Sequence, residues 1–285
     1  MPRVRTIDWQ MSQGDGRWAL RPSGWREREP ALPWPTELLD ALETRFGFKP
    51  PREHGHNTVM AISAMEQGRA KVFIGLGGNF AQATPDTPRT HAALRNCELT
   101  VHIATKLNRS HLVTGREALI LPCLGRTDID IQANGPQGIT VEDTFSMVHA
   151  STGMNEPVSP LCLSEIDIVA RMAEATLGSD RVDWLALRDD YGLLRDLIEE
   201  TIAGFGDFNR RIEEPCGFHL ENSAALLRWN TASGRAEFRA SRLPDSILPE
   251  CTSHAEQMVG EPVLLLQSLR SHDQYNTTIY GMDDR

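Results

Sequence analysis

The stretch from Lys71 to Thr105 constrains the fold of this chain more than any other part of its sequence. It reads KVFIGLGGNF, then AQATPDTPRTHAALRNCE, then LTVHIAT. A short β-branched and aromatic run breaks into glycines, a segment with an apolar helical stripe follows, and a second strand-like run ends the unit. Strand, glycine turn, helix and strand in this order predict a βαβ unit with parallel strands.

Two further runs extend this prediction. EALILP at 117–122 and GITVED at 138–143 predict a third and a fourth strand of the same sheet. The nearly continuous apolar character of VFI and ALIL predicts that the sheet is covered on both faces. The predicted fold class is therefore α/β, with a Rossmann-like parallel sheet.

Helices are predicted around this sheet. Four segments carry apolar residues at helical spacing, namely 36–46, 57–67, 163–178 and 183–205. Thr36 and Ser164 are candidate N-caps, and Gly192 weakens the middle of the last helix. The region 206–260 is rich in loops, with short strands predicted near GFHL and RAEFRA, and a new strand is predicted to start at Val263.

Charge and cysteine usage narrow the classes of function. The 285 residues include 29 Lys and Arg against 39 Asp and Glu, and the net charge of −10 argues against general nucleic-acid binding. No run approaches the ~18–20 apolar residues of a membrane span, and the N-terminal residues lack the apolar region of a secretory signal. The five cysteines never form CxxC, which fits reduced thiols and offers neither a zinc site nor an iron–sulfur cluster. We expect a cytoplasmic protein without a membrane span.

The glycine turn GLGGNF, residues 75–80, lies where dinucleotide-binding folds hold phosphate, between a strand and a helix. Glycines at this place let backbone N–H groups approach an anion, and the helix dipole stabilises its charge. The pattern is not G-x-G-x-x-G, because Phe80 occupies the third glycine position, and no acidic residue ends the next strand. Ordinary NAD binding is therefore disfavoured, while nucleotide binding and a plain strand-to-helix turn both stay open.

A polar loop follows the second strand. TKLNRSH, residues 105–111, supplies hydroxyl, cationic and amide groups that suit a phosphate or a polar heterocycle. Ligands of open α/β sheets collect at the carboxyl ends of the strands, where this loop begins. Lys106 is one of only three lysines in the chain. A ligand role is favoured here over a solvated loop.

A second polar loop, PCLGRTDID, follows the third strand. Cys123 is a candidate nucleophile, but a small buried thiol is the favoured interpretation because no neighbouring base is visible. Thr127, Asp128 and Asp130 are candidates for a polar pocket, with a cap or loop role as the alternative. RSHDQYNTTIYG, residues 270–281, offers further groups for phosphate and heterocycle edges, with a polar surface loop as its alternative.

Four stretches together resemble the alpha subunits of molybdopterin oxidoreductases, in the formate dehydrogenase-like branch that carries bis-molybdopterin guanine dinucleotide. They are KVFIGLGGNFAQATPDT, LTVHIATKLNRSHLVTGREALILPCLGRTDID, ITVEDTFSMVHAS and RSHDQYNTTIYG, in the same order as in that family. The likeness covers residues 36–285, and residues 1–35 match less well.

The resemblance implies a division of the chain and a set of cofactor contacts. An irregular lead-in over 1–35 precedes an α/β domain over 36–255 that holds one guanine dinucleotide arm, and residues 260–285 begin a β-barrel domain that closes over the pterins. The implied contacts lie on four segments and comprise Gly75, Gly77, Gly78, Asn79, Thr105, Lys106, Asn108, Ser110, His111, Cys123, Gly125, Thr127, Arg270, His272, Gln274, Asn276 and Thr277.

The chain departs from that family in its length. Family members are much longer and place the iron–sulfur cysteines, the molybdenum ligand and another dinucleotide domain before this region. We therefore expect a partial oxidoreductase chain that binds the molybdenum cofactor but does not turn over alone, with any iron–sulfur cluster in an N-terminal part not seen here. The expected partner is an electron-transfer protein or the other portion of the same enzyme. The alternative is a stand-alone nucleotide-binding or regulatory module without catalysis.

Overall fold

The computed structural model describes residues 36–52, 55–84, 86–143, 145–221, 226–229, 231–238 and 240. The described residues up to 235 belong to one compact unit, Trp34–Arg235. The predicted lead-in over 1–35, the strand at Val263 and the domain over 260–285 lie outside the described residues. Within the described part of the chain, no helix combines the length and the apolar character needed to cross a membrane.

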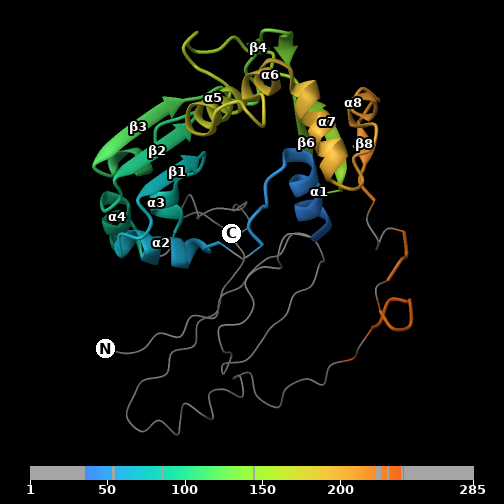
Figure 1. Ribbon diagram of the computed structural model, residues 1–285, viewed down its shortest axis with the longest axis horizontal. Coiled ribbons are helices and arrows are strands. Elements are labelled where there is room, and N and C mark those ends of the chain that lie inside the picture. The colour runs from blue at the N-terminus through green and yellow to red at the C-terminus, as the bar shows by residue number, and fades with distance from the viewer. Residues whose placement is uncertain are drawn as a thin grey trace, which may run out of the picture. The chain divides into compact units, whose positions relative to one another are not determined.

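This unit contains a three-stranded parallel sheet in the order β1-β2-β3 (Figure 1). Its strands are β1 (Val72–Leu76), β2 (Leu99–Ala104) and β3 (Glu117–Pro122). The crossover from β1 to β2 runs through the short helix α3 (Phe80–Ala83) and then α4 (Thr87–Arg95). The register places His102 opposite Gly75 on one side and Ile120 on the other. The α/β class and the parallel βαβ unit are thus confirmed.

Helices pack on both faces of this sheet. On one face, α2 (Thr58–Glu66) and α4 bury apolar side chains against Phe73 of β1. On the other face, Ile168 of α5 (Glu165–Leu177) packs against Val101 and Ile103 of β2. Figure 1 shows α5 and the α2–α4 group on different sides of the three strands.

Side-chain caps explain where two of the helices begin. The Asn57 side chain accepts a hydrogen bond from the backbone N–H of Met60, and the Ser164 hydroxyl accepts one from the N–H of Asp167. Each cap satisfies one of the N–H groups that the first turn leaves without a partner. The predicted helices over 57–67 and 163–178 are confirmed as α2 and α5, and the helix over 36–46 is confirmed as α1 (Thr36–Phe46).

Among the described residues, the sheet is covered less completely than the sequence predicts. β2 is buried along four of its six residues, whereas side chains of β1 and β3 are half-exposed. The helix α5 lies against β2 and one side of β3, so it does not reach across the whole sheet. An apolar strand sequence shows which residues avoid water, but not whether a helix is present to cover them.

The fourth predicted strand belongs to a different sheet. β6 (Ile139–Glu142) pairs antiparallel with β7 (Met147–Ser151), which pairs with β8 (Phe218–His219). The prediction that residues 138–143 continue the parallel sheet is therefore wrong. A parallel pairing needs a long crossover, usually a helix. The chain between β3 and β6 instead forms a small hairpin of β4 (Asp130–Gln132) and β5 (Gly135–Gln137).

Two further predictions concern the C-terminal half. β8 confirms the short strand near GFHL, while within the described residues of RAEFRA, 235–238 and 240, no strand forms. The helix predicted over 183–205 is two helices, α6 (Trp184–Asp189) and α7 (Tyr191–Thr201). Asp190 has an extended backbone, and its carboxylate accepts a hydrogen bond of 2.7 Å from the N–H of Gly192. This capping residue ends one helix and begins the next.

The second sheet has its own small core. Phe208 of α8 (Phe208–Arg211) packs with Val148 of β7 and Phe218 of β8, and Ile198 of α7 adds to this cluster. The rings of Phe208 and Phe218 are perpendicular, with centroids 5.5 Å apart. Burial of these aromatic rings holds the short strand β8 against the sheet.

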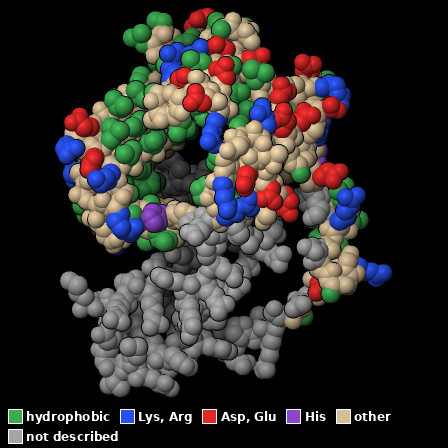
Figure 2. Space-filling view, viewed as in Figure 1, with side chains coloured by type: hydrophobic (Ala, Val, Ile, Leu, Met, Phe, Trp, Pro, Cys, Tyr) green, Lys and Arg blue, Asp and Glu red, His purple; other side chains and the backbone are tan. Residues whose placement is uncertain are grey.

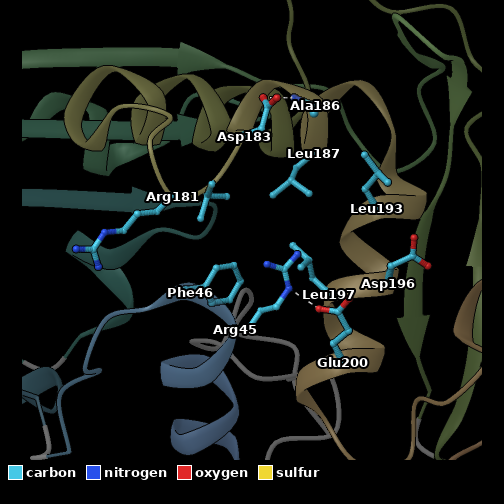
Figure 3. Close-up of a pocket in the computed structure, with 11 residues that line it drawn as sticks. Arg45, Phe46, Arg181, Asp183, Ala186, Leu187, Leu193, Asp196, Leu197 and Glu200 are labelled. Carbon is cyan, nitrogen blue, oxygen red and sulfur yellow. Dashed lines mark hydrogen bonds and ion pairs between the residues drawn. The ribbon is translucent and has the colours of Figure 1, made fainter.

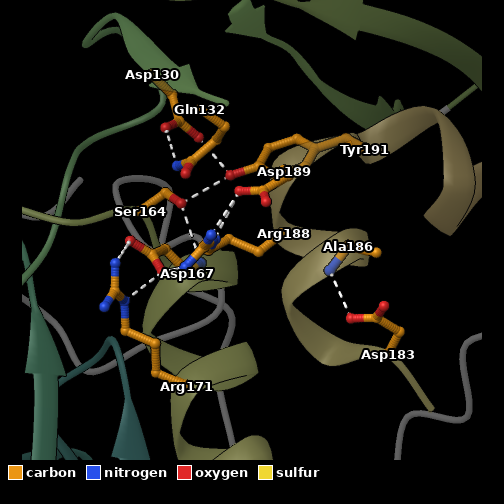
Figure 4. A network of polar contacts seen from close by, with 10 residues as sticks. All are labelled: Asp130, Gln132, Ser164, Asp167, Arg171, Asp183, Ala186, Arg188, Asp189 and Tyr191. Atoms are coloured by element: carbon orange, nitrogen blue, oxygen red, sulfur yellow. Dashed lines mark hydrogen bonds and ion pairs between the residues drawn. The ribbon is translucent and has the colours of Figure 1, made fainter. Parts of the chain in front are cut away.

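A buried polar network connects the hairpin with α5 and α7 (Figure 4). The Tyr191 hydroxyl donates to the Asp130 carboxylate and lies 2.7 Å from the Ser164 hydroxyl. Burial raises the pKa of Tyr191, and the Asp130 carboxylate adds to this, so the hydroxyl keeps its proton. Nearby, Arg171 Nε donates to the buried Asp167 carboxylate over 2.6 Å. The network fixes the hairpin that follows β3.

Candidate functional site

The glycine turn after β1 exposes backbone N–H groups at the carboxyl edge of the sheet. Gly77 and Gly78 have positive φ angles of 69° and 68°, and a Cβ added at either residue would meet nothing within 4 Å. The N–H of Gly77 donates to the carbonyl of Ile103 over 2.8 Å, which anchors the turn to β2. Among the described residues, the N–H groups of Gly78 and Asn79 find no acceptor. An anion can therefore approach this turn and bind its free donors.

The loop after β2 clamps the glycine turn. The Ser110 hydroxyl donates to Asn79 Oδ1 over 2.9 Å and accepts from the N–H of Ala81 over 3.0 Å. The Asn108 side-chain amide donates to the carbonyl of Gly78 over 2.7 Å. The structure thus brings together four of the predicted site residues, Gly78, Asn79, Asn108 and Ser110, from two loops that are about 30 residues apart in sequence.

A capping box shapes the same loop. Asn108 precedes the 3-10 helix η1 (Arg109–Leu112), its Oδ1 accepts from the N–H of Ser110, and its own N–H donates to His111 Nδ1 over 2.8 Å. Ser110 and His111 are buried. These side chains therefore hold the loop in shape, whereas Thr105 and Lys106 at its start are exposed. Within the described residues, Lys106 has no ion-pair partner.

The loop after β3 lies beside the loop after β2. A Cβ added at Gly125 would lie 4.0 Å from Thr105 Cγ2, and the N–H of Gly125 donates to the Asp128 carboxylate over 2.8 Å. The carbonyl of Thr127 accepts from the N–H groups of Met154 and Asn155, each over 2.9 Å. The sequence left open whether Asp128 and Asp130 line a pocket or stabilise a loop. Asp128 stabilises its loop through the N–H of Gly125, and Asp130 does so through the Tyr191 hydroxyl.

Cys123 lies in the core and not on the surface of this site. Its side chain is 5% exposed and packs with Val101, Ile103 and Ile168. Burial raises the pKa of Cys123 to about 11, and the charge of Glu165 adds to this effect. Because the thiolate is the nucleophilic form, a thiol with this pKa is inert at neutral pH. The geometry supports the buried-thiol interpretation.

Two residues that sequence reasoning did not single out belong to this edge. His102 is buried, its ring lies 5.1 Å from that of His111, and its Nε2 has no hydrogen-bond partner among the described residues. Burial lowers the pKa of His102, and His111 contributes to the shift. Arg126 is exposed in the loop after β3. The alternation in LTVHIAT, which puts Thr100 and His102 on one face of β2, is the signal that points to the histidine.

The rest of the predicted contacts cannot be placed relative to this edge. Arg270, His272, Gln274, Asn276 and Thr277 lie outside the described residues. Over the described part of the chain, no group of three or more His, Cys, Asp and Glu side chains is arranged to hold a metal ion.

A separate cavity of about 300 Å³ lies between α1, α6 and α7 (Figure 3). Phe46, Leu187 and Leu197 give it an apolar lining, and Arg45 pairs with Glu200 across it. Arg181 donates to the carbonyl of Gly47 over 3.0 Å. These charged groups already have partners within the fold, so the cavity offers a ligand little beyond apolar contact. The edge of the parallel sheet, with its free N–H groups, is the better candidate site.

Comparison with known proteins gives relatives but no family. The chain matches no protein-family model. It is 46% identical over 249 residues to a protein of Escherichia coli K12 named YdeP, an alignment that covers 87% of this chain and 32% of that protein. It is 48% identical over 255 residues to proteins of Mycobacterium tuberculosis H37Rv and Mycobacterium bovis that are named uncharacterized oxidoreductases, covering 88% of this chain and 31% of each. The chain spans about a third of the length of the curated relatives it matches.

Proposed function

We propose that this chain is the part of a molybdopterin-dependent oxidoreductase that binds one arm of bis-molybdopterin guanine dinucleotide. Three observations support this function. Relatives at 48% identity bear the name oxidoreductase, the sequence resembles the formate dehydrogenase-like branch, and the glycine turn has free donors at the carboxyl edge of a parallel sheet. The last observation carries the proposal, because it is the one that offers a binding chemistry.

The residues present fit the anionic part of such a cofactor. The left-handed Gly78 leaves open space above its backbone, and the N–H groups of Gly78 and Asn79 are free to donate to a phosphate oxygen. Lys106 and Arg126, exposed on the two neighbouring loops, supply positive charge. The buried Ser110 keeps Asn79 and the start of α3 in place, so these donors are held in position before a ligand arrives.

This fit assigns different roles to the cofactor and to the chain. The cofactor, when bound, supplies two-electron redox chemistry through its metal. The side chains and backbone described above bind and orient its phosphates, and none of them is placed to take part in bond making. We therefore propose that the chain alone binds the dinucleotide without catalysing turnover. Any catalytic activity, with its substrate and electron acceptor, is proposed only for a longer polypeptide such as the relatives.

Titration with GDP, followed by calorimetry, tests the proposed site, because GDP carries the guanine and two phosphates of the dinucleotide arm. We expect GDP to bind, and we expect Lys106→Ala to weaken its binding about tenfold or more, since a charge-assisted hydrogen bond contributes ~1.5–3 kcal/mol. Lys71→Ala is the matched control, because Lys71 pairs with Glu98 next to the amino ends of β1 and β2, away from the glycine turn.

The outcomes separate the two functions left open by the sequence. Binding of GDP in preference to ADP, weakened in Lys106→Ala and kept in Lys71→Ala, supports the guanine dinucleotide site. Equal binding of ADP and GDP favours a general nucleotide-binding module. No binding of either, or equal weakening by the two lysine variants, contradicts a phosphate site at this edge.

A further inference from the structure

A buried histidine lies beside the start of the glycine turn. His102 of β2 is 4% exposed, and its Nε2 has no hydrogen-bond partner among the described residues. The parallel register pairs His102 with Gly75, and a Cβ added at Gly75 would lie 2.9 Å from Phe73 Cε1 and 3.6 Å from His102 Nδ1. Gly75 therefore leaves room for these two rings. A buried polar atom without a partner is uncommon in a folded protein and needs an explanation.

His102 belongs to a cluster of aromatic rings. The centroid of its ring lies 5.7 Å from that of Phe73 and 5.1 Å from that of His111. Figure 2 shows hydrophobic side chains gathered over the region of β1, β2 and β3. Such surroundings disfavour a charge, and burial together with His111 lowers the pKa of His102 from its ordinary value of 6.5. The ring of His102 is therefore neutral at pH 7.5.

Among the described residues, His111 is the neighbour whose charge acts on His102. Other titratable groups lie on the elements around β2, and none of them shifts the pKa of His102. They are Glu66 on α2, Arg89, His91 and Arg95 on α4, Cys97 before β2, Arg109 on η1 and Glu117 on β3. The charge state at this place therefore depends on the two imidazoles and on their burial.

His111 connects the aromatic cluster with the glycine turn. Its Nδ1 accepts the N–H of Asn108 over 2.8 Å, and the Asn108 side-chain amide donates to the carbonyl of Gly78 over 2.7 Å. A proton on Nδ1 would change this atom from an acceptor into a donor, directed to the Asn108 carbonyl 3.1 Å away. The Asn108 N–H would then lose its acceptor. The contact that holds Gly78 therefore depends on a neutral His111.

We propose that the His102–His111 pair makes anion binding at the glycine turn dependent on pH, because both rings must be neutral for the site to bind. In acid the pair takes up a proton from water. On His111 this proton breaks the contact with the Asn108 N–H, and on His102 it places a charge beside His111 with no acceptor among the described residues. Either change releases Asn108 from Gly78. This inference rests on the proposed function and adds the regulation of the same site.

The sign of the pH dependence follows from proton linkage. The ordered turn binds fewer protons than the released turn, so acid favours the released form and weakens anion binding. Binding is complete above pH 6.5 and is lost as the pH falls below this value, since the pKa of His102 is lowered in the fold. Linkage to one proton changes the affinity by at most about tenfold per pH unit.

GDP binding at pH 7.5 and pH 5.5, measured by calorimetry, tests the pair. The double variant His102→Phe with His111→Gln cannot take up the proton, while the glutamine carbonyl can still accept the Asn108 N–H. We expect the dissociation constant to rise between the two pH values at least threefold more in the original chain than in the double variant. Protonation of GDP itself cancels in this comparison. His149→Phe is the matched control and is expected to behave as the original chain, because His149 pairs with Asp143 in the other sheet.

Hydrogen exchange of the original chain, followed by NMR without ligand, tests the same pair independently of GDP. We expect the protection factor of the Asn108 amide to fall at least tenfold from pH 7.5 to pH 5.5. The Met60 amide is the control, because its acceptor is the Asn57 side chain, which does not titrate. We expect the protection of Met60 to stay constant.

The results separate the failure of this inference from that of the proposed function. No binding of GDP to the original chain at pH 7.5 contradicts the nucleotide site, whatever the amides show. Binding with the same pH dependence in the original chain and the double variant overturns the inference, as does tighter relative binding by the original chain at pH 5.5. Constant protection of Asn108 overturns it too. Should the double variant fail to fold, the amide measurement decides, because it uses the original chain.

Discussion

Ser110 joins the two loops that form the candidate site. Its hydroxyl contacts Asn79 and the N–H of Ala81, and both it and Ala81 are buried. The sequence showed a serine in a polar loop after a strand, which suggested a direct ligand contact. The structure gives it a supporting role, because its partners lie 29 and 31 residues away and such distant pairings are not visible in local sequence.

Replacing Ser110 by alanine is expected to destabilise the fold. The N–H of Ala81 would be left buried without a partner, which costs ~1–3 kcal/mol. The free energy of unfolding in urea measures this. Ser63→Ala is the control, because among the described residues the Ser63 hydroxyl accepts only from an exposed Gln67 side chain, and we expect a change within about 0.5 kcal/mol. Equal effects of the two substitutions would show that the Ser110 contacts contribute nothing specific.

Cys123 allows a test of burial by chemical reactivity. Iodoacetamide at pH 8, with mass spectrometry of the native protein, is expected to alkylate the exposed Cys216 and to leave Cys123 unmodified. The pKa of Cys123 is raised from 9.0 to about 11, so the folded state holds the proton more tightly than the unfolded state. Its contribution to stability is complete below pH 9 and is lost as the pH rises towards 11. Alkylation of Cys123 at the rate of Cys216 would contradict its place in the core.

Among the secondary-structure elements, the sequence was most informative where a local signal fixed both ends. The glycines after β1, the Ser164 cap and the apolar run of β2 predicted a parallel βαβ unit and α5 correctly. The prediction for β6 was wrong because strand pairing depends on the connection before it, and here that connection is a hairpin. The break between α6 and α7 was missed because an aspartate can be a solvated helix residue or a cap, and Asp190 is the cap.

Tyr191 tests how the hairpin is attached to the helices. Tyr191→Phe removes the hydroxyl that Asp130 and Ser164 share, so we expect a loss of ~1–3 kcal/mol in the free energy of unfolding. A double-mutant cycle with Asp130→Asn measures the interaction directly. Because the two residues are in contact, their effects are expected to be non-additive by more than about 0.5 kcal/mol. Strictly additive losses would mean that the two side chains act independently.

For the whole molecule, a net charge of −10 is compatible with the proposed anion site at one edge of the sheet, because such binding depends on local donors. The N–H groups of Gly78 and Asn79, which have no acceptor among the described residues, lie beside loops that carry exposed Lys106 and Arg126. The sequence predicted the glycine turn and the loop after β2 as neighbours, because the carboxyl ends of parallel strands share an edge. It could not predict which side chains support the loops, because these contacts join residues that are about 30 positions apart.

The most direct test of this account is the nucleotide content of the purified chain. The full 285-residue chain is produced in a host that makes molybdopterin guanine dinucleotide, and guanine nucleotide released by denaturation and hydrolysis is quantified. We expect one guanine nucleotide per chain if a single molybdopterin guanine dinucleotide is bound, or two if the bis form is bound by one arm, and none from Gly78→Val, whose side chain would occupy the space above the glycine turn. Circular dichroism confirms that this variant folds. A chain that carries no guanine nucleotide, or a folded Gly78→Val variant that carries as much as the original, would contradict the account.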